Sequence, residues 1–271
     1  MLTPRSSTAV LYGRILELFR RVDIHLMFAH TSIGMHGFPV LILRIEYQCT
    51  DFFQFRVFPI PEGLATNKAA PMLCAGLTAY SPLVRNGCGP GKRVGIVGMG
   101  GIGHFGIMFA KALGAETWAI SRTHSKEADA KKMGADGFMA TADKDWNVPH
   151  IMTFDLIINT ASSTEGFDLE KYLSLLDVHG RWVSVGLPEG SGQEVKAQTF
   201  LSNGCLIGAS HLGSRKEVLA MLQLAVDKGV DSWVEEIPIS ADGLATALTR
   251  LHNNDVKYRF TLTGYDKVFG S

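Results

Sequence analysis

The chain has little net charge, few cysteines and no long uninterrupted run of apolar residues. Its 271 residues include 26 Lys and Arg and 26 Asp and Glu. This balance excludes the net basic surface that binding to nucleic acid or to an anionic membrane requires. No apolar run approaches the roughly 18 residues of a membrane-spanning helix. We therefore expect neither nucleic acid nor a membrane as a partner.

The four cysteines, Cys49, Cys74, Cys88 and Cys205, lie far apart and form no CxxC pair. Their spacing excludes a local zinc knuckle and does not suit a disulfide framework in a chain of this length. Reduced thiols are typical of the cytoplasm, which is the location we expect. Residues 1–30 interleave arginines with apolar residues, and an amphipathic transit segment is the alternative.

From residue 88 onward, apolar runs rich in β-branched residues alternate with segments whose apolar residues recur every three or four positions. The runs predict strands at 93–97, 117–121, 137–141, 155–160, 181–187 and 205–209. The segments between them predict helices at 105–113, 126–133, 168–177 and 215–227. Glycines stand where these helices should end in a left-handed residue: Gly114, Gly134, Gly180 and Gly229. The alternation predicts an α/β fold, a doubly wound parallel six-stranded Rossmann domain.

The N-terminal part of the chain lacks this regularity. Residues 1–55 show neither strict alternation nor a long amphipathic period, and the PIPEG sequence at 59–63 marks where order begins. We place a boundary between residues 55 and 67. Residues 255–265 alternate like a strand beyond the last helix. This tail should pair with a segment outside the nucleotide-binding domain.

A glycine motif, G-x-G-x-x-G, directly follows the first predicted strand, in the sequence VGIVGMGGIGHFG. Its first glycine permits a tight turn, its second lets the backbone approach a pyrophosphate, and its third allows close helix–strand packing. The helix behind it points its positive end at the phosphates. Strand, turn and helix predict a dinucleotide site, the alternative being a packing turn without a ligand. The residues that we expect to contact the cofactor here are Gly98, Gly100, Gly101, Ile102 and Gly103.

The second strand ends in ISRTHSK, which contains no acidic residue. A site that prefers NAD usually has one there, about 20 positions after the glycines, to bond the ribose hydroxyls. This chain has Ser121, Arg122 and Lys126 instead. A carboxylate would repel a 2′-phosphate, whereas a hydroxyl and two cations would hold it. We therefore predict NADP(H) as the cofactor, the alternative being that the two cations only solvate a helix start.

Several motifs agree in order and spacing with one known family. They read AAPMLCAGLTAYSPLVRNGCGPGKRVGIVGMGGIGHFG, ISRTHSK and VKYRFTLTGYDK. From about Val57 to Phe269 the chain resembles the zinc-dependent medium-chain alcohol dehydrogenases, in their NADP-dependent, cinnamyl-alcohol-dehydrogenase-like branch. The resemblance implies three parts. These are a truncated remnant of a GroES-like β catalytic domain at 1–66, the NADP-binding Rossmann domain at 67–235, and a segment returning to the catalytic domain at 236–271.

The resemblance implies an alcohol or aldehyde oxidoreductase. A hydride passes between the nicotinamide of NADP(H) and a primary alcohol or aldehyde, and a catalytic zinc acts as the Lewis acid. The family's last zinc ligand is the Cys of LCAGLTAY, here Cys74, on a helix predicted over 69–84. Thr78 would lie close to the nicotinamide. Ser121, Arg122 and Lys126 match the branch's 2′-phosphate contacts.

The resemblance also assigns residues near the end of the Rossmann domain. Ser210 and Arg259 match positions that usually touch the cofactor. The family commonly dimerises through the region of its sixth strand, here about 205–212, so this chain can form a homodimer.

The chain departs from the family before residue 66. A Cys-containing motif that ends in Ser-Asp-Ile-His, a Gly-His-Glu motif and a lobe with four Cys are all missing. The sequences VDIH (22–25) and GFPVLILRIE (37–46) are weak traces of the first two, with Leu43-Arg44-Ile45 in place of Gly-His-Glu. Losing the domain that carries these motifs would leave the tail strand 257–263 with an unpaired edge.

The possible metal ligands of this chain are few. Cys74 alone cannot hold zinc, and a small buried residue is its alternative reading. His25, His30 and His36 are spaced loosely enough to suggest ligands, although ordinary histidines explain them as well. Most of the family's zinc ligands are thus absent, which puts the activity in question.

Three functions remain open. The first is an NADP(H)-dependent alcohol or aldehyde oxidoreductase. The second is a catalytically silent NADPH-binding protein that acts as a partner or regulator of another protein. The third is a zinc-independent reductase of the same superfamily that reduces an alkene or a quinone, and Cys74 within LCAGLTAYSPL counts against it.

Overall fold

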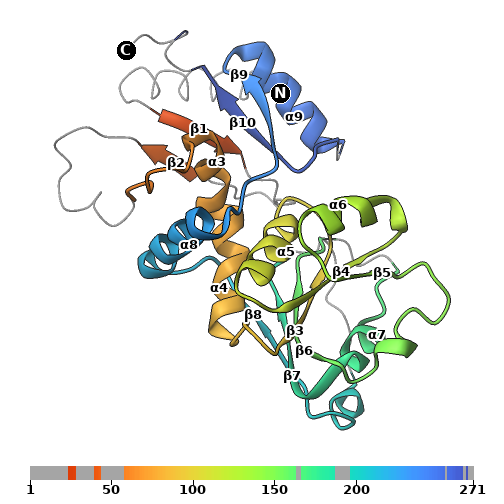
Figure 1. Cartoon of the computed structure of the whole chain (residues 1–271). Helices are drawn as coiled ribbons and strands as arrows, with labels where there is room; N and C mark the ends of the chain where they lie inside the picture. The colour runs from red at the N-terminus through yellow and green to blue at the C-terminus, as the bar shows by residue number, and fades with distance from the viewer. Residues whose placement is uncertain are drawn as a thin grey trace, which may run out of the picture.

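The structure is a computed structural model that describes residues 58–162, 166–186, 196–253, 255–264 and 267, with the backbone of two strands at 24–28 and 40–43. The described elements form two β-sheets, with helices packed around and between them (Figure 1). Within these residues, every helix is too short or too polar to cross a lipid bilayer.

The larger sheet has six parallel strands in the order β5-β4-β3-β6-β7-β8. Their bounds are β3 (Arg93–Val97), β4 (Glu116–Ser121), β5 (Gly137–Ala140), β6 (Phe154–Asn159), β7 (Leu176–Ser184) and β8 (Leu206–Ala209). The predicted doubly wound Rossmann sheet is therefore confirmed. The strand order reverses between β3 and β6, and sheets of this kind bind ligands in the crevice at that point.

The helices lie near the predicted positions. They are α3 (Thr66–Pro71), a π-helical turn η1 (Met72–Gly76), α4 (Leu77–Arg85), α5 (Gly103–Ala112), α6 (Glu127–Lys132), α7 (Leu169–Ser174), α8 (Arg215–Lys228) and α9 (Ala241–His252). Short 3₁₀ segments are η2 (His124–Lys126), η3 (Val148–His150) and η4 (Ala197–Phe200). The first three elements follow one another without a break, so the helix predicted over 69–84 is present and somewhat longer.

One of the predicted helix ends is wrong. Gly114, Gly134 and Gly229 follow α5, α6 and α8 with φ of 92°, 96° and 66°, as left-handed caps. Gly180 instead lies inside β7, and α7 already ends at Ser174. A Cβ at Gly180 would stand 2.9 Å from the carbonyl oxygen of Phe154. Glycine is therefore required there for close approach of the backbone within the sheet.

The smaller sheet has the order β2-β1-β10-β9. Its strands are β2 (Val40–Leu43), β1 (Ile24–Phe28), β10 (Arg259–Thr263) and β9 (Val234–Pro238). The tail strand β10 pairs with β1 on one side and β9 on the other. The expected unpaired edge of the tail is therefore wrong, because two strands flank it. The predicted boundaries at residues 66 and 235 stay predictions.

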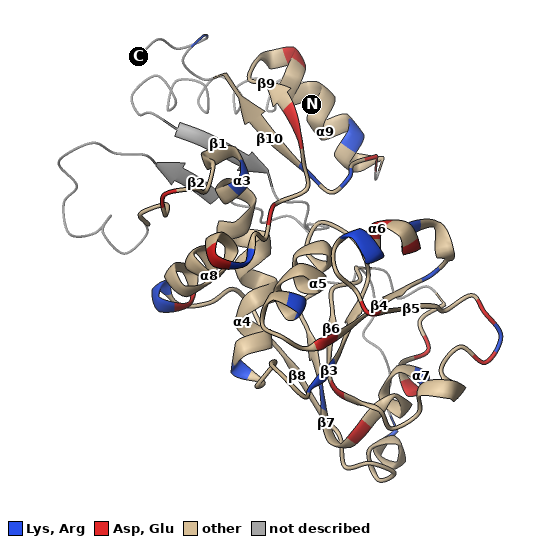
Figure 2. Ribbon diagram, in the orientation of Figure 1, with Lys and Arg blue, Asp and Glu red and all other residues tan. Residues whose placement is uncertain are grey.

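Helices α4, α5 and α8 pack together beside the larger sheet (Figure 1). Their contact buries a continuous apolar core. At the edge of this core, a group of polar side chains joins α4 to α8. Glu217, in the first turn of α8, accepts hydrogen bonds from Arg85 Nε at 2.7 Å and Ser81 Oγ at 3.0 Å. Positive and negative residues are interspersed over the described elements, and β8 carries neither (Figure 2).

Candidate nucleotide site

The turn after β3 is built for close contact with a ligand. The N–H of Gly98 donates to the carbonyl oxygen of Ile120 at 2.9 Å and continues the pairing of β3 with β4, and its φ of 87° then turns the chain out of the sheet. A Cβ at Gly103 would stand 1.7 Å from the oxygen of Gly98, so α5 can begin here only with glycine. A Cβ at Gly100 would meet nothing within 4 Å. The turn is thus tight on its inner side and open at Gly100.

Arg259 reaches this turn from β10, in the other sheet. Its side chain is fully buried, and Nε donates to the carbonyl oxygen of Gly101 at 2.8 Å. The other two guanidinium nitrogens have no partner within the described structure. Burial lowers the pKa of Arg259 to about 10, so the group stays charged at neutral pH. A buried cation with only one of its three nitrogens hydrogen-bonded within the described structure is costly, and an anion bound at the turn would offset that cost.

His104, the second residue of α5, lies beside Arg259. Its Nδ1 is 3.2 Å from the carbonyl oxygen of Gly100, and its Nε2 has no partner in the described structure. The ring stacks on Tyr258 with a centroid distance of 5.4 Å. Complete burial, followed by the charge of Arg259, lowers the pKa of His104 to about 3. The imidazole is therefore neutral and adds no charge to the turn.

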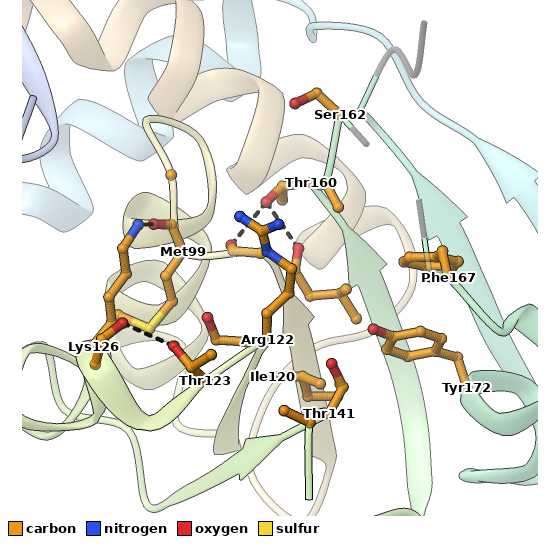
Figure 3. A pocket seen from close by; sticks show the side chains of 18 residues that line it. Met99, Ile120, Arg122, Thr123, Lys126, Thr141, Thr160, Ser162, Phe167 and Tyr172 are labelled. Carbon is orange, nitrogen blue, oxygen red and sulfur yellow. Dashed lines mark hydrogen bonds between the residues drawn. The ribbon is translucent and has the colours of Figure 1, made fainter. Parts of the chain in front are cut away.

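A cavity of about 580 Å³ opens at the carboxyl ends of the central strands (Figure 3). Its volume lies within the range of small-molecule sites. None of the described residues that line it is acidic. The polar lining comes from the loop after β4 and from hydroxyl groups at the ends of β5 and β6. These lining residues are Ser121, Arg122, Thr123, Ser125, Lys126, Thr141, Thr160 and Ser162.

Lys126 connects the loop after β4 to the glycine turn. Its Nζ donates to the carbonyl oxygen of Met99 at 2.6 Å and lies 5.4 Å from the centre of the Tyr258 ring. Burial lowers the pKa of Lys126, and the nearby charges of Lys257 and Arg122 act in the same direction. An ammonium group held among other cations is suited to receive a phosphate.

The loop after β4 is also fixed by His124. The ring nitrogens of His124 lie 2.8 Å from Glu127 Oε2 and 2.9 Å from Asp143 Oδ2. The hydrogen bonds to Glu127 and then Asp143 raise the pKa of His124. The bond to Asp143 joins η2 to the loop after β5, and both segments contribute residues to the cavity lining.

The predicted metal ligand is not joined by others. Cys74 lies in the π-helical turn, where burial raises the pKa of its thiol and the charge of Arg259 opposes that shift. Within the described residues, no three His, Cys, Asp or Glu side chains come together as a metal site. His25 lies in β1, whose side chains are not described, and His30 and His36 lie outside the described residues. The described side chains therefore do not fit a catalytic zinc.

The other predicted site residues fall into three groups: some line the cavity, some lie at the turn beside it, and some are outside its lining. Gly98, Gly100, Ser121, Arg122 and Lys126 line it. Gly101, Ile102 and Gly103 form the turn beside it, and Arg259 contacts that turn from β10. Thr78, buried in α4, is not among the lining residues, and neither are Cys74 or Ser210, which follows β8. The positions of Thr78 and Ser210 thus leave their roles as predictions.

Sequence reasoning missed several residues of this site. His104 directly follows the last motif glycine, a position that could have drawn notice. Thr160 follows β6, where its hydroxyl oxygen lies 2.9 Å from the carbonyl oxygens of both Val97 and Gly98, either of which can accept its one proton. Phe167 and Tyr172 enter the cavity from the connection after β6, and no local sequence pattern marks them.

Comparison with protein families identifies the cavity-bearing part. The model of the zinc-binding dehydrogenase family matches residues 101–227. The NADP-dependent alcohol dehydrogenase 6 of Saccharomyces cerevisiae is 48% identical over 214 residues, covering 79% of this chain and 59% of the relative. A probable cinnamyl alcohol dehydrogenase 8D of Oryza sativa is 37% identical, covering 82% of this chain and 58% of the relative.

Solved structures give the same picture. A cinnamyl alcohol dehydrogenase from Sorghum bicolor matches with a TM-score of 0.69 and 37% identity, over 75% of this chain and 57% of that one. The cinnamyl alcohol dehydrogenase of Helicobacter pylori, solved as a complex with NADP(H), matches with a TM-score of 0.65 and 29% identity, over 76% and 57%. The chain spans less than three fifths of the length of each of these.

Proposed function

We propose that the chain, whose residues 101–227 match the zinc-binding dehydrogenase family and which is similar to NADP-dependent and cinnamyl alcohol dehydrogenases, binds NADP(H) in this cavity. By descent its reaction is hydride transfer between the nicotinamide and a small primary alcohol or aldehyde. The observation that carries the proposal is Arg259, a buried cation at a glycine turn, two of whose nitrogens have no partner among the described residues. Such a group fits a pyrophosphate.

The chain's residues can be assigned to the parts of the cofactor. The N–H groups of the glycine turn, the first turn of α5 and Arg259 would hold the pyrophosphate. Ser121, Arg122 and Lys126 would hold the 2′-phosphate, since they line the cavity and none of its described lining residues is acidic. We keep Thr78 and Ser210 as proposed contacts of the remainder of the cofactor.

Bound NADP(H) supplies the hydride chemistry, and the chain's residues bind and orient it. The neutral His104 and the buried Arg259 would hold the glycine turn in place. Lys126 can exchange its hydrogen bond to the Met99 carbonyl oxygen for one to a phosphate. We derive no step through zinc, because Cys74 has no fellow ligands among the described residues.

A catalytically silent NADPH-binding protein is the second candidate. It is favoured because the described residues provide the proposed cofactor site and no metal site. A partner or regulator of another protein would need only the cofactor site. The two candidates share the cavity and differ in turnover.

A homodimer through the edge of the larger sheet is a further part of the proposal. Among the described strands, β8 pairs with β7 alone, and its Leu206 and Ile207 are 54% and 42% exposed. An apolar strand edge without charges is a surface that another strand can cover. Light scattering would give twice the chain mass, and Ile207→Lys would give the single mass.

The cytoplasm is the compartment we propose. The described cysteines Cys74, Cys88 and Cys205 are all free thiols, as reducing compartments maintain. We also propose the division into a catalytic-domain remnant (1–66), an NADP-binding domain (67–235) and a returning segment (236–271). The pairing of β10 with β1 supports the return.

The experiment that tests the function combines metal analysis with an NADPH-coupled assay on aromatic and aliphatic aldehydes. Stoichiometric zinc with turnover would support the oxidoreductase and exclude the silent protein. Tight NADPH binding with neither metal nor turnover would support the silent protein and exclude the zinc enzyme. Absence of NADPH binding would exclude both.

A further inference from the structure

A buried aromatic ring contacts one of the cations that face the cavity. Nζ of Lys126 lies over the Tyr258 ring, 5.4 Å from its centre and within reach of a cation–π contact. The same ammonium donates to the carbonyl oxygen of Met99 at 2.6 Å (Figure 3). Lys126 lines the cavity, whereas Tyr258 does not. Tyr258 can therefore act on a ligand of the cavity only through another residue.

Tyr258 is itself held on several sides. It is only 3% exposed, and its ring stacks on His104 at 5.4 Å and packs on Trp233 at 5.8 Å. Its hydroxyl donates to Oδ2 of Asp129 at 2.8 Å. Asp129 lies in the first turn of α6, the helix that Lys126 directly precedes. The ring is thus fastened to the segment that bears the ammonium it contacts.

The carboxylate that anchors Tyr258 is paired with a different lysine. Oδ2 of Asp129 also accepts a hydrogen bond from Nζ of Lys257 at 2.9 Å. This hydrogen bond from Lys257, ahead of the one from Tyr258, lowers the pKa of Asp129. The carboxylate therefore stays charged and is balanced by Lys257, which leaves the charge of Lys126 available to an anion in the cavity.

An aromatic ring is well suited to hold a lysine that has to bind a phosphate. The lysine side chain has several rotatable bonds, and fixing them when the ligand arrives costs rotamer entropy. The face of the ring attracts the ammonium and carries no charge that would repel a phosphate. A carboxylate in the same place would repel it. With the ring beside it, Lys126 is in position before the ligand binds.

We propose that Tyr258 is a positioning residue for Lys126, and that through Lys126 it contributes to the preference of the cavity for a nucleotide that carries a 2′-phosphate. The inference rests on the proposed NADP(H) function and adds a residue from the C-terminal part of the chain. Two consecutive residues of that part then serve two phosphate groups. Tyr258 acts on the loop after β4, and Arg259 contacts the glycine turn.

Calorimetric titration of the full chain with NADPH and with NADH tests this role. Tyr258→Leu should weaken NADPH by about fivefold, the size of a partly buried cation–π contact, and leave NADH unchanged. Tyr258→Phe keeps the ring beside Lys126 and should retain most of the NADPH affinity. Thermal melting checks the fold. If Tyr258→Leu is unfolded at the assay temperature, Tyr258→Met, whose flexible side chain adapts to irregular space, takes its place with the same expected result.

A double-mutant cycle tests whether the effect passes through Lys126. Lys126→Ala should weaken NADPH and leave NADH unchanged. Tyr258→Leu added to Lys126→Ala should bring no further loss of NADPH affinity, because the ring then has no cation to hold. Losses that add up in the double variant would contradict the positioning role, since Tyr258 would then act on NADPH by another route.

Phe260→Leu is the matched control. Phe260 lies two positions after Tyr258, is 2% exposed, and also has a cation over its ring, Arg250 at 4.7 Å. It packs on Ala247 and Leu251 of α9 and does not line the cavity. Phe260→Leu removes the same kind of contact from the same strand. Its affinities for NADPH and NADH should equal those of the wild type.

The outcomes separate this inference from the function on which it rests. If the wild type binds neither nucleotide, the NADP(H) function itself fails. If the wild type prefers NADPH and Tyr258→Leu keeps that preference in full, the function stands and the positioning role is wrong. The role is also wrong if Tyr258→Leu weakens NADPH and NADH equally, or if Phe260→Leu loses as much of the preference as Tyr258→Leu.

Discussion

The guanidinium group of Arg259 lies directly against Gly101, two residues that are 158 positions apart in the chain. Nε donates to the Gly101 carbonyl oxygen at 2.8 Å. A Cβ on Gly101 would stand 2.5 Å from both Nε and Cζ of Arg259. The contact joins the smaller sheet to the glycine turn of the larger one, and it needs glycine.

Gly101→Ala should therefore displace Arg259 without unfolding the chain, because the atoms that clash are the far end of a flexible side chain. Loss of one charge-assisted contact to the cofactor should weaken NADPH binding by about tenfold or more. Calorimetry and thermal melting measure the two effects. Gly208→Ala is the control, since a Cβ there meets nothing within 4 Å. Unchanged NADPH affinity in Gly101→Ala would contradict the role given to Arg259.

Arg259→Met should separate stability from binding. It replaces a buried cation, two of whose nitrogens have no partner among the described residues, by an apolar side chain of similar length. The free energy of unfolding of the cofactor-free protein should rise by about 1 kcal/mol or more, because the desolvation cost of the cation disappears. The affinity for NADPH should fall at least about tenfold. Urea titrations with and without NADPH test both; a variant that is less stable and binds normally would refute the argument.

His124 gives a pH dependence. Its pKa is raised above the ordinary 6.5 by hydrogen bonds to Glu127 and Asp143. A raised pKa in the folded state means that the stabilisation is fully present below 6.5 and is lost as the pH rises through the folded-state pKa. His124→Gln should accordingly be less stable than the wild type at pH 5.5 and approach it at pH 9. Urea titrations across this range measure the difference, and a gap that widens with rising pH would exclude the ionic contact.

Much of the larger sheet was predictable, since its signals are local. The buried run RVGIV gives β3 at its observed bounds, 93–97, because a strand covered on both faces is apolar throughout. Gly98 and Gly103 predict the turn because only glycine fits the positive φ of the first and the close backbone contact of the second. Ser121, Arg122 and Lys126 line the same cavity as the glycines because their distance from the glycines is set by one βαβ unit, and their contact with the cofactor stays a prediction.

The rest depended on contacts between distant segments. Gly180 looks like a helix end but is needed where β7 passes Phe154, 26 positions earlier in the chain, and spacing does not reveal that contact. β10 pairs with β1 across more than 200 residues. Phe167 and Tyr172 read as ordinary core residues, and only the fold brings them to the cavity beside Arg122.

The central claim is that this cavity binds NADP(H) through the loop after β4. Calorimetric titration of the wild type and of Arg122→Ala with NADPH and with NADH tests it most directly. The wild type should bind NADPH at least about tenfold more tightly than NADH, since charge-assisted hydrogen bonds to the 2′-phosphate are worth about 1.5 kcal/mol or more. Arg122→Ala should reduce that preference by weakening NADPH alone. Equal affinity of the wild type for both, or an equal loss for both in Arg122→Ala, would contradict the account.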